Sequence, residues 1–264
     1  MRYGLISDIH GNLAALRAAV SFLSDAGVDG YLCPGDVVGY GPQPNECVEL
    51  LASLPAHCVA GNHDLIATGR LSDEHIGALA RRTLEWTRSV LEPGARAWLE
   101  ALPLRAEVPG AIVAHGSLTD PRRYISTDKL AAQQLALLAQ EATARILVLG
   151  HTHRATAFGE RSGRVLDSEP GTIALSDAER WLLNPGAIGQ SRRRGVHAWV
   201  AVLDLDRRSA AFHALPYDVA ATRTELLRHG LPPSAVHLPP RRGPRALMVR
   251  MVAAARSAGR SSRP

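Results

Sequence analysis

Cysteine is scarce in this chain of 264 residues, with three copies at Cys33, Cys47 and Cys58. Their spacing is neither that of a zinc finger nor that of a redox motif. Apolar residues surround all three, which favours buried thiols in a reducing compartment. The shortage of thiolates also argues against a metal site built on soft sulfur ligands.

Long apolar runs are lacking as well. No stretch reaches the roughly 18 uninterrupted apolar residues of a membrane span, so we expect no membrane-spanning helix. The sequence passes from Met1 directly into a strand-like segment, and a cleavable signal there would remove the first motif described below. We therefore expect a cytoplasmic protein. With 46% hydrophobic and 21% charged residues, the composition is that of a globular protein with a substantial core.

Lysine is nearly missing, and the positive charge lies almost entirely on arginine. Lys129 is the one lysine, while residues 241–264 hold seven arginines and no acidic residue. Subtracting these seven charges from the formal net charge of +5 leaves −2 for the rest, which argues against a basic nucleic-acid-binding core. We divide the chain into one domain over residues 1–240 and a flexible tail, which includes a short amphipathic helix over about 245–256. Any contact with nucleic acid would involve the tail alone.

The N-terminal part alternates between strand-like and helix-like segments. Residues 2–7, 30–33 and 56–60 are typical of buried strands. Between them, Asn12 can cap a helix that ends near Gly27, and a second helix is expected over 44–54. This order predicts parallel strands whose functional residues gather at the carboxyl ends.

The remaining pattern is mixed. A helical insertion is predicted over about 65–110, then strands at 111–114 and 145–149 on either side of a helix over 127–141. Further along, short strands separated by turns are expected at 155–159, 164–168, 180–183, 197–205 and 209–215. Because no helix separates these later strands, we expect them to form an antiparallel second sheet packed against the first.

Side chains that bind metals follow the apolar runs in five places. These segments are Asp8-Ile9-His10, Gly35-Asp36, Gly61-Asn62-His63-Asp64, Ala114-His115-Gly116 and Gly150-His151-Thr152-His153. Residues two apart point the same way on an extended strand, which pairs Asp8 with His10 and His151 with His153. Carboxylate, amide and imidazole donors together suit divalent cations, and two cations held close together promote displacement at phosphorus.

This ordered set resembles the calcineurin-like metallophosphoesterase superfamily. Three longer strings resemble its small bacterial and archaeal phosphodiesterase branch: Ser-Asp-Ile-His-Gly-Asn (7–12), Gly-Asp-Val-Val-Gly-Tyr-Gly-Pro (35–42) and Asn-Pro-Gly-Ala-Ile-Gly-Gln (184–190). The resemblance spans about residues 3–205. It implies an α/β fold, a four-layer α/β/β/α sandwich of two packed mixed sheets with a helical insertion and with metals at the edge between the sheets.

The resemblance also implies two sets of metal ligands and a catalytic histidine. One metal ion would be bound by Asp8, His10, Asp36 and His153, and the other by Asp36, Asn62, His115 and His151, with Asp36 as the bridge. His63 would face the leaving-group oxygen as general acid or charge stabiliser, and Asp64 would orient its imidazole. The cofactors would be two divalent ions, Mn, Fe, Zn, Co or Ni, with manganese favoured.

Residues and resemblance together predict a binuclear-metal-dependent phosphoesterase acting by in-line attack of a metal-bridging hydroxide. The expected partner is a small-molecule or nucleotide-like phosphate ester, with a phosphodiester favoured. A phosphomonoesterase or protein phosphatase is the alternative, although residues 37–41 (Val-Val-Gly-Tyr-Gly) lack the arginine that protein phosphatases carry after Gly-Asp. A metal-binding scaffold without activity is an alternative of a different class, against which the full set of ligand positions argues.

Candidate substrate contacts are fewer. Asn184 and Gly186 could line the phosphate pocket or only form a turn, and Arg192, in an arginine run, could steer a phosphate or be solvated. That run departs from the acidic loop common in the family. Tyr40 could stack on a nucleobase, but packing under its glycine turn is favoured, and Tyr124 follows the His115 motif as in the phosphodiesterase branch.

Overall fold

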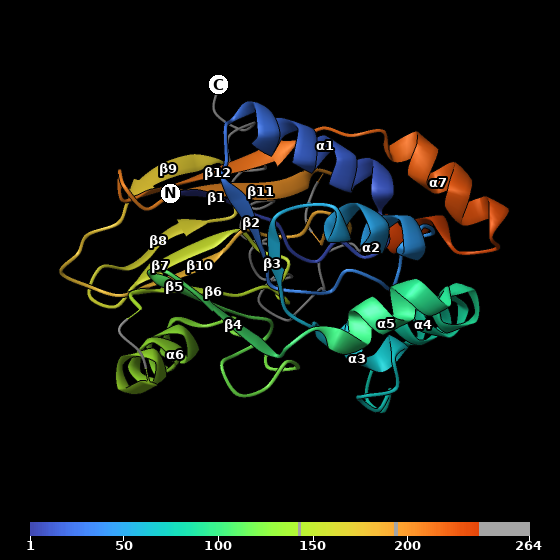
Figure 1. Ribbon diagram of the computed structural model, residues 1–264, viewed down its shortest axis with the longest axis horizontal. Coiled ribbons are helices and arrows are strands. Elements are labelled where there is room, and N and C mark those ends of the chain that lie inside the picture. The colour runs from blue at the N-terminus through green and yellow to red at the C-terminus, as the bar shows by residue number, and fades with distance from the viewer. Residues whose placement is uncertain (142–143, 193–194, 238–264) are drawn as a thin grey trace, which may run out of the picture.

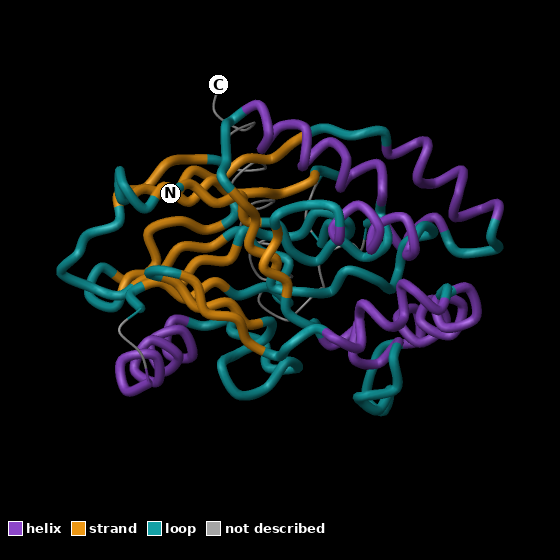
Figure 2. The backbone as a smooth tube through the Cα atoms, viewed as in Figure 1, coloured by secondary structure: helices purple, strands orange, loops and turns teal. Residues whose placement is uncertain are grey.

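A computed structural model of the chain describes residues 1–141, 144–192 and 195–237. The tail over 241–264 and the helix expected within it lie outside the described residues. Two sheets face each other, with helices on their outer faces (Figure 1) and loops gathered at one end of the strands (Figure 2). The predicted four-layer α/β/β/α sandwich of two mixed sheets is confirmed.

The first sheet has the order β3-β2-β1-β11-β12-β9. Its strands are β1 (Arg2–Leu5), β2 (Gly30–Cys33), β3 (Ala56–Cys58), β9 (Gly171–Ala174), β11 (Ala198–Asp204) and β12 (Ser209–Leu215). The first three strands are parallel, because each is joined to the next by a crossover helix. The other three pair antiparallel on the far side of β1.

The second sheet has the order β4-β5-β6-β10-β7-β8. Its strands are β4 (Arg105–Val108), β5 (Ala111–Ala114), β6 (Ile146–Val148), β7 (Thr156–Gly159), β8 (Gly163–Asp167) and β10 (Trp181–Asn184). Strands β5, β6 and β10 are parallel, while β4, β7 and β8 run antiparallel to their neighbours. Both sheets are therefore mixed.

Two expectations about these strands were wrong. The strands after residue 154 do not form a sheet of their own: β7, β8 and β10 complete the second sheet, and β9, β11 and β12 complete the first. Strand β11 illustrates the reason, because both of its faces are buried. Val200 packs toward the helices and Ala201 toward the other sheet, as expected for an interior strand. The helical insertion also ends earlier than 110, because Arg105–Val108 is an edge strand paired with β5.

Helices cover both outer faces of the sandwich. They are α1 (Leu13–Asp25), α2 (Pro44–Ala52), α3 (Asn62–Ala67), α4 (Ala78–Val90), α5 (Pro93–Ala101), α6 (Asp128–Glu141), α7 (Val219–Arg228) and the 3₁₀ turn η1 (Pro233–Val236). Figure 1 shows α1 above the first sheet, with α2 and α7 next to α1, and α6 below the second sheet. The Asn12 side chain accepts a hydrogen bond from Ala15 N and so caps α1 as expected. Helix α7 was not predicted.

Apolar side chains fill the spaces between the four layers of helices and sheets. Leu5 and Phe212 lie fully buried between the two sheets, Leu16 under α1, and Leu135 under α6. Each such side chain stabilises the fold by about 1.5–3 kcal/mol through burial. The three cysteines are buried, as predicted. Among the described residues no helix is long and apolar enough to cross a membrane.

Candidate metal centre

The predicted metal ligands meet at one edge of the sandwich. The loops after β1, β2 and β3 carry ligands from the first sheet, and those after β5 and β6 carry ligands from the second. The side chains brought together are Asp8, His10, Asp36, Asn62, His63, His115, His151 and His153. All of them are exposed by 6% or less.

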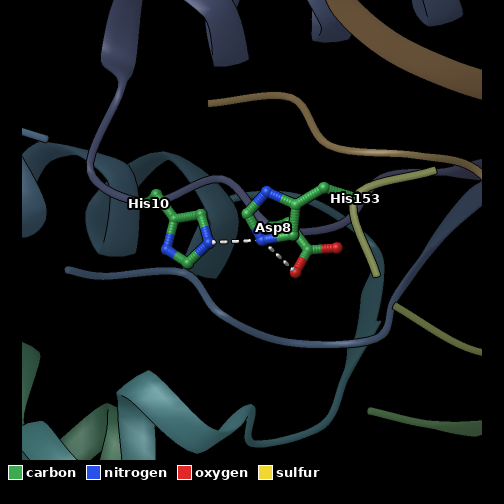
Figure 3. A group of neighbouring side chains, drawn as sticks. All are labelled: Asp8, His10 and His153. Carbon is green, nitrogen blue, oxygen red and sulfur yellow. Dashed lines mark hydrogen bonds and ion pairs between the residues drawn. The ribbon is translucent and has the colours of Figure 1, made fainter. Parts of the chain in front are cut away.

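A first ligand group is formed by Asp8, His10 and His153 (Figure 3). The Nε2 atoms of the two histidines are 3.1 Å apart, and His153 Nε2 lies 3.3 Å from Asp8 Oδ1. At the other side of each ring, His10 Nδ1 is 3.2 Å from Val38 O, and His153 Nδ1 is 2.8 Å from Gln190 O.

These contacts fit a cation. A carbonyl oxygen only accepts hydrogen bonds, so both Nδ1 atoms must carry the proton, and in the neutral rings both Nε2 atoms present lone pairs. Two lone pairs and a carboxylate oxygen then converge without a donor between them. Such a convergence is stable when a metal ion, or an extra proton, lies among the three atoms.

A second group is formed by Asp36, His115 and His151, with Asn62 beside them. His115 Nε2 lies 3.3 Å from Asp36 Oδ2 and 3.1 Å from Asn62 Oδ1. The Nδ1 atom of His115 is 2.6 Å from the Pro34 carbonyl. His151 is held by the opposite nitrogen, because its Nε2 is 3.0 Å from a backbone carbonyl and Nδ1 is left as the ligand atom.

Asp36 lies between the two groups. Its Oδ2 is 3.7 Å from His10 Nε2 and 3.3 Å from His115 Nε2, while its Oδ1 accepts a hydrogen bond from His63 N at 2.8 Å. Oδ2 of Asp36 therefore contacts both ligand groups, and Oδ1 holds the backbone at the start of α3.

His63 also lies close to this carboxylate. Its ring forms a third group of candidate ligands with His10 and Asp36. Among the described residues, the buried Nδ1 of His63 has no hydrogen-bond partner, and a Cβ on Gly39 would come within 2.3 Å of it. Burial lowers the pKa of His63 to about 4, with Asp36 opposing and His153 adding to the shift, so the ring is neutral at pH 7.

Asp64 contacts the backbone instead of the His63 imidazole that we expected it to orient. Its Oδ1 accepts hydrogen bonds from Val37 N at 2.9 Å and Val38 N at 3.1 Å, and its Oδ2 accepts one from Gly61 N at 2.9 Å. The carboxylate lies in the first turn of α3, where free N–H groups attract an acceptor. Asp64 thus joins the start of α3, where His63 lies, to the loop that carries Asp36.

The histidines differ in protonation. Burial lowers the pKa of His10 and His153, and lowers that of His151 to about 3, so these rings stay neutral as metal ligands must. Burial alone would lower the pKa of His115 as well, but Asp36 outweighs it, with further support from Asp8, and raises the value to about 9. Metal-free His115 is therefore protonated at pH 7.

Five of the predicted ligands adopt a left-handed backbone conformation. Their φ angles lie between 51° and 65°, at Asp8, His10, Asp36, His151 and His153. Outside glycine such angles are uncommon and cost roughly 1–3 kcal/mol each. Asp8 and His10 are thus in a strained turn beyond the end of β1 and not on the extended strand that we expected. Hydrogen bonds from Asp8 N to Gly35 O and from His10 N to Asp36 O hold this turn.

Asn184 and Gly186 support the loop that carries His151 and His153. The Asn184 amide donates to Gly150 O at 2.6 Å and to Thr152 Oγ1 at 3.1 Å, and its oxygen accepts from Gly186 N at 2.9 Å. Both amide protons are used in these bonds, which favours the turn and positioning role over a substrate contact. Gly186 has φ of +89° and no room for a side chain.

Arg192 and the tyrosines complete the surroundings. Tyr40 is buried, with its ring 4.8 Å from that of His10 and 4.7 Å from that of His63, so packing is confirmed as its role. Arg192 Nη1 donates to the Tyr124 hydroxyl at 3.0 Å, and the Tyr124 ring lies 3.9 Å from the His151 ring. Residues 193–194 of the arginine run lie outside the described residues.

Two supporting residues were not singled out from the sequence. Ser7 Oγ donates to Asp8 Oδ2 at 2.9 Å, and the Gln190 carbonyl holds His153 Nδ1. Both lie within the strings that resemble the family, but a hydroxyl or a backbone carbonyl carries no metal-binding signal of its own.

Comparisons with known proteins identify the family of this chain. Residues 1–208 match the model of the calcineurin-like phosphoesterase superfamily domain. An uncharacterized protein of Methanocaldococcus jannaschii is 29% identical over 234 residues, which are 86% of this chain and 93% of that protein.

Solved structures show the same likeness. A metallophosphoesterase from Sphaerobacter thermophilus is 36% identical, with a TM-score of 0.77 over 89% of this chain and 96% of that one. A hypothetical protein from Pyrococcus horikoshii has a TM-score of 0.71 over the same shares at 20% identity, which is a likeness of fold. The chain belongs to the calcineurin-like phosphoesterase superfamily and is a metal-dependent hydrolase of phosphoric esters.

Proposed function

We propose that this protein uses two divalent cations to hydrolyse a phosphodiester with a small or nucleotide-like substituent. The observation that carries the proposal is the place of Asp36, whose Oδ2 reaches His10 on one side and His115 on the other. A carboxylate in that place suits a ligand shared by two metal ions.

The residues divide into two ligand sets in this proposal. Asp8, His10, His153 and Asp36 bind one ion, and Asp36, Asn62, His115 and His151 bind the other. When bound, the ions supply a water of lowered pKa and neutralise charge on the phosphate. The mixture of oxygen and nitrogen donors accepts several divalent metals, of which we favour manganese.

His63 acts on the leaving-group side of the substrate. Because its pKa lies near 4, the ring is neutral at pH 7 and stabilises the leaving oxygen by donating a hydrogen bond more readily than by delivering a full proton. This favours the charge-stabilising role over the general-acid role. Asp64 keeps the start of α3, where His63 lies, aligned to the loop with Asp36 through its three backbone hydrogen bonds.

A metal screen tests the proposal. The metal-free chain is given Mn, Co, Ni, Zn or Mg, and its turnover is measured with p-nitrophenyl phosphate and with bis(p-nitrophenyl) phosphate. We expect manganese to support turnover, with the diester preferred. A preference for the monoester would instead favour a phosphomonoesterase. Two bound metal ions without turnover of any ester would support the scaffold alternative, and anomalous scattering that finds no metal would refute both.

A further inference from the structure

Tyr124 and Arg192 form a pair that joins the two ligand groups at the edge of the metal centre. The Tyr124 ring lies 3.9 Å from the ring of His151, a ligand of the second group, at an interplanar angle of 38°. Arg192 Nη1 donates to the Tyr124 hydroxyl at 3.0 Å, and Arg192 Nε donates to Gln190 Oε1 at 3.3 Å. The carbonyl of Gln190 holds His153, a ligand of the first group.

The charge of Arg192 acts on the candidate metal centre. Burial is the main cause of the lowered pKa values of His63 and His153, and the Arg192 guanidinium adds to both shifts, while the Asp8 carboxylate stabilises the positive charge of Arg192. A guanidinium group has five N–H donors, and among the described residues Nη2 of Arg192 has no hydrogen-bond partner. It therefore has a free donor edge, and its contacts with Tyr124 and Gln190 place it beside residues that contact both ligand groups.

Part of the Tyr124 ring is open to solvent. The residue is 45% exposed, although the His151 ring packs against it. Arg192 Cζ lies over the ring at 5.8 Å from its centroid, toward the hydroxyl to which Arg192 donates, so the guanidinium covers that end of the ring. An exposed aromatic ring next to a metal ligand is a platform for another planar group.

We propose that Tyr124 and Arg192 form a substrate-recognition subsite for phosphate esters in which the group that stays on phosphorus carries a planar aromatic ring, such as a nucleobase. Arg192 binds a non-bridging phosphate oxygen through its free donor edge, and the exposed part of the Tyr124 ring stacks on that aromatic group. This inference rests on the proposed function and narrows its substrate class.

The two side chains differ in what they recognise. Stacking on an aromatic side chain discriminates between esters with and without a ring, and its loss corresponds to a roughly five- to hundredfold change per base. The guanidinium recognises the phosphate that every substrate shares, so its contribution is the same for all of them. The subsite therefore predicts two different patterns of selectivity.

Three diesters with one leaving group test this pattern. Thymidine 5′-(p-nitrophenyl) phosphate, phenyl p-nitrophenyl phosphate and methyl p-nitrophenyl phosphate all release p-nitrophenolate and differ in the group that stays on phosphorus. The full chain loaded with manganese is assayed on each. We expect kcat/KM to be at least about fivefold higher for the two aromatic esters than for the methyl ester.

Variants separate recognition from support of His151. Tyr124→Leu should remove the preference for aromatic esters, mainly through KM, while Tyr124→Phe should keep it because the ring remains. Arg192→Gln should lower kcat/KM for all three esters by about tenfold, the scale of a lost charged hydrogen bond. Arg123→Gln is the matched control, because Arg123 is an exposed arginine beside Tyr124, and it should behave as the wild type.

Two kinetic outcomes would overturn the proposal. One is a wild type without preference among the three esters. The other is a Tyr124→Leu variant that slows all three equally, since this would make the ring a support for His151 and nothing more.

A binding measurement keeps the subsite testable apart from turnover. Thymidine 5′-monophosphate and methyl phosphate are titrated into the manganese-loaded chain by calorimetry. The nucleotide should bind about fivefold or more tightly, and Tyr124→Leu should abolish the difference. Absence of turnover with every ester would contradict the proposed function, whereas equal affinity for the two ligands would contradict the subsite.

Discussion

The two ends of the β-sandwich differ in how far their charged side chains are exposed to solvent. At the metal end, Asp8 and Asp36 are buried among histidines at the carboxyl ends of parallel strands. At the opposite end, Arg180 pairs with Glu160 at 3.5 Å, and both side chains remain partly in contact with solvent. The metal end thus gathers carboxylates and imidazoles away from water, whereas the Arg180–Glu160 pair at the other end stays in contact with solvent.

The candidate metal site therefore has a cost in stability. Buried carboxylates lose their hydration, and the left-handed angles of five ligands add backbone strain. Partly exposed ion pairs such as Arg180–Glu160 keep part of their hydration and contribute little, about 0–1 kcal/mol each. Substitutions at the two ends should therefore have unlike effects.

The largest effect is expected for Asp36→Asn. The amide would retain the shape of the side chain but lose the charge that both ligand groups share, so metal content should fall at both positions. Turnover should drop by more than about a hundredfold. Elemental analysis and ester hydrolysis check this, with the exposed Asp25→Asn as control. A variant that keeps two metals and its activity would contradict the bridging role.

His63→Ala should come next. The variant should keep its metal content, because His63 is outside both proposed ligand sets, and should slow esters with poor leaving groups by about a hundredfold. Esters with good leaving groups should be affected less. A series of aryl diesters of graded leaving-group pKa measures this, with His57→Ala, an exposed histidine, as control. Equal slowing across the series, or loss of metal, would rule out the proposed role.

Asn184→Ala should weaken metal binding by about 10–100-fold, the usual effect of losing a residue that orients ligands. The change removes the hydrogen bonds to Gly150 O and Thr152 Oγ1 beside the two histidines of that loop. Metal titration checks the affinity. Asn45→Ala is a matched control, since Asn45 also bonds the backbone, at Val90 and Glu92, but lies in α2, outside the segments that carry the predicted ligands. Similar affinities in both variants would show that Asn184 has no positioning role.

Metal binding should release a proton from His115. With a pKa of about 9 this ring is charged in the metal-free protein at pH 7, and a ligand must be neutral. The affinity should therefore rise about tenfold per pH unit below pH 9 and level off above it. Calorimetry in buffers of different ionisation enthalpy should count about one proton released at pH 7. No release would show that His115 is already neutral.

The smallest effect is expected at the opposite end. Arg180→Ala should change the free energy of unfolding by about 1 kcal/mol or less and leave turnover unchanged. Chemical denaturation and the ester assay measure the two quantities. A clear loss of activity would contradict the functional separation of the two ends.

Much of this architecture could be predicted from the sequence. The alternation of strand and helix through β1, α1, β2, α2 and β3 has clear periodicity, and the motifs at the strand ends indicated which side chains would meet. Less could be predicted for β4 and β9, which are four-residue edge strands without a continuous apolar run. Helix α7 buries only two side chains, Thr222 and Leu226, so its apolar signal is weak.

Other features depend on contacts that no motif records. Each later strand joins the sheet that has an edge free for pairing. Periodicity in the sequence does not identify that edge. The role of Asp64 depends on backbone N–H groups that any residue supplies, so its proximity to His63 in sequence suggested the wrong partner. The left-handed angles of the ligands arise from the crossing of loops, which sequence spacing does not encode.

Each ligand group draws its members from both sheets. Asp8 and His10 follow a strand of the first sheet and His153 one of the second, just as Asp36 and His115 come from opposite sides of the sandwich. A cation in either position therefore fastens the two halves of the protein to each other. Metal binding should make the sandwich unfold as one cooperative unit. A chain in which only one sheet has formed would lack a complete metal-binding site.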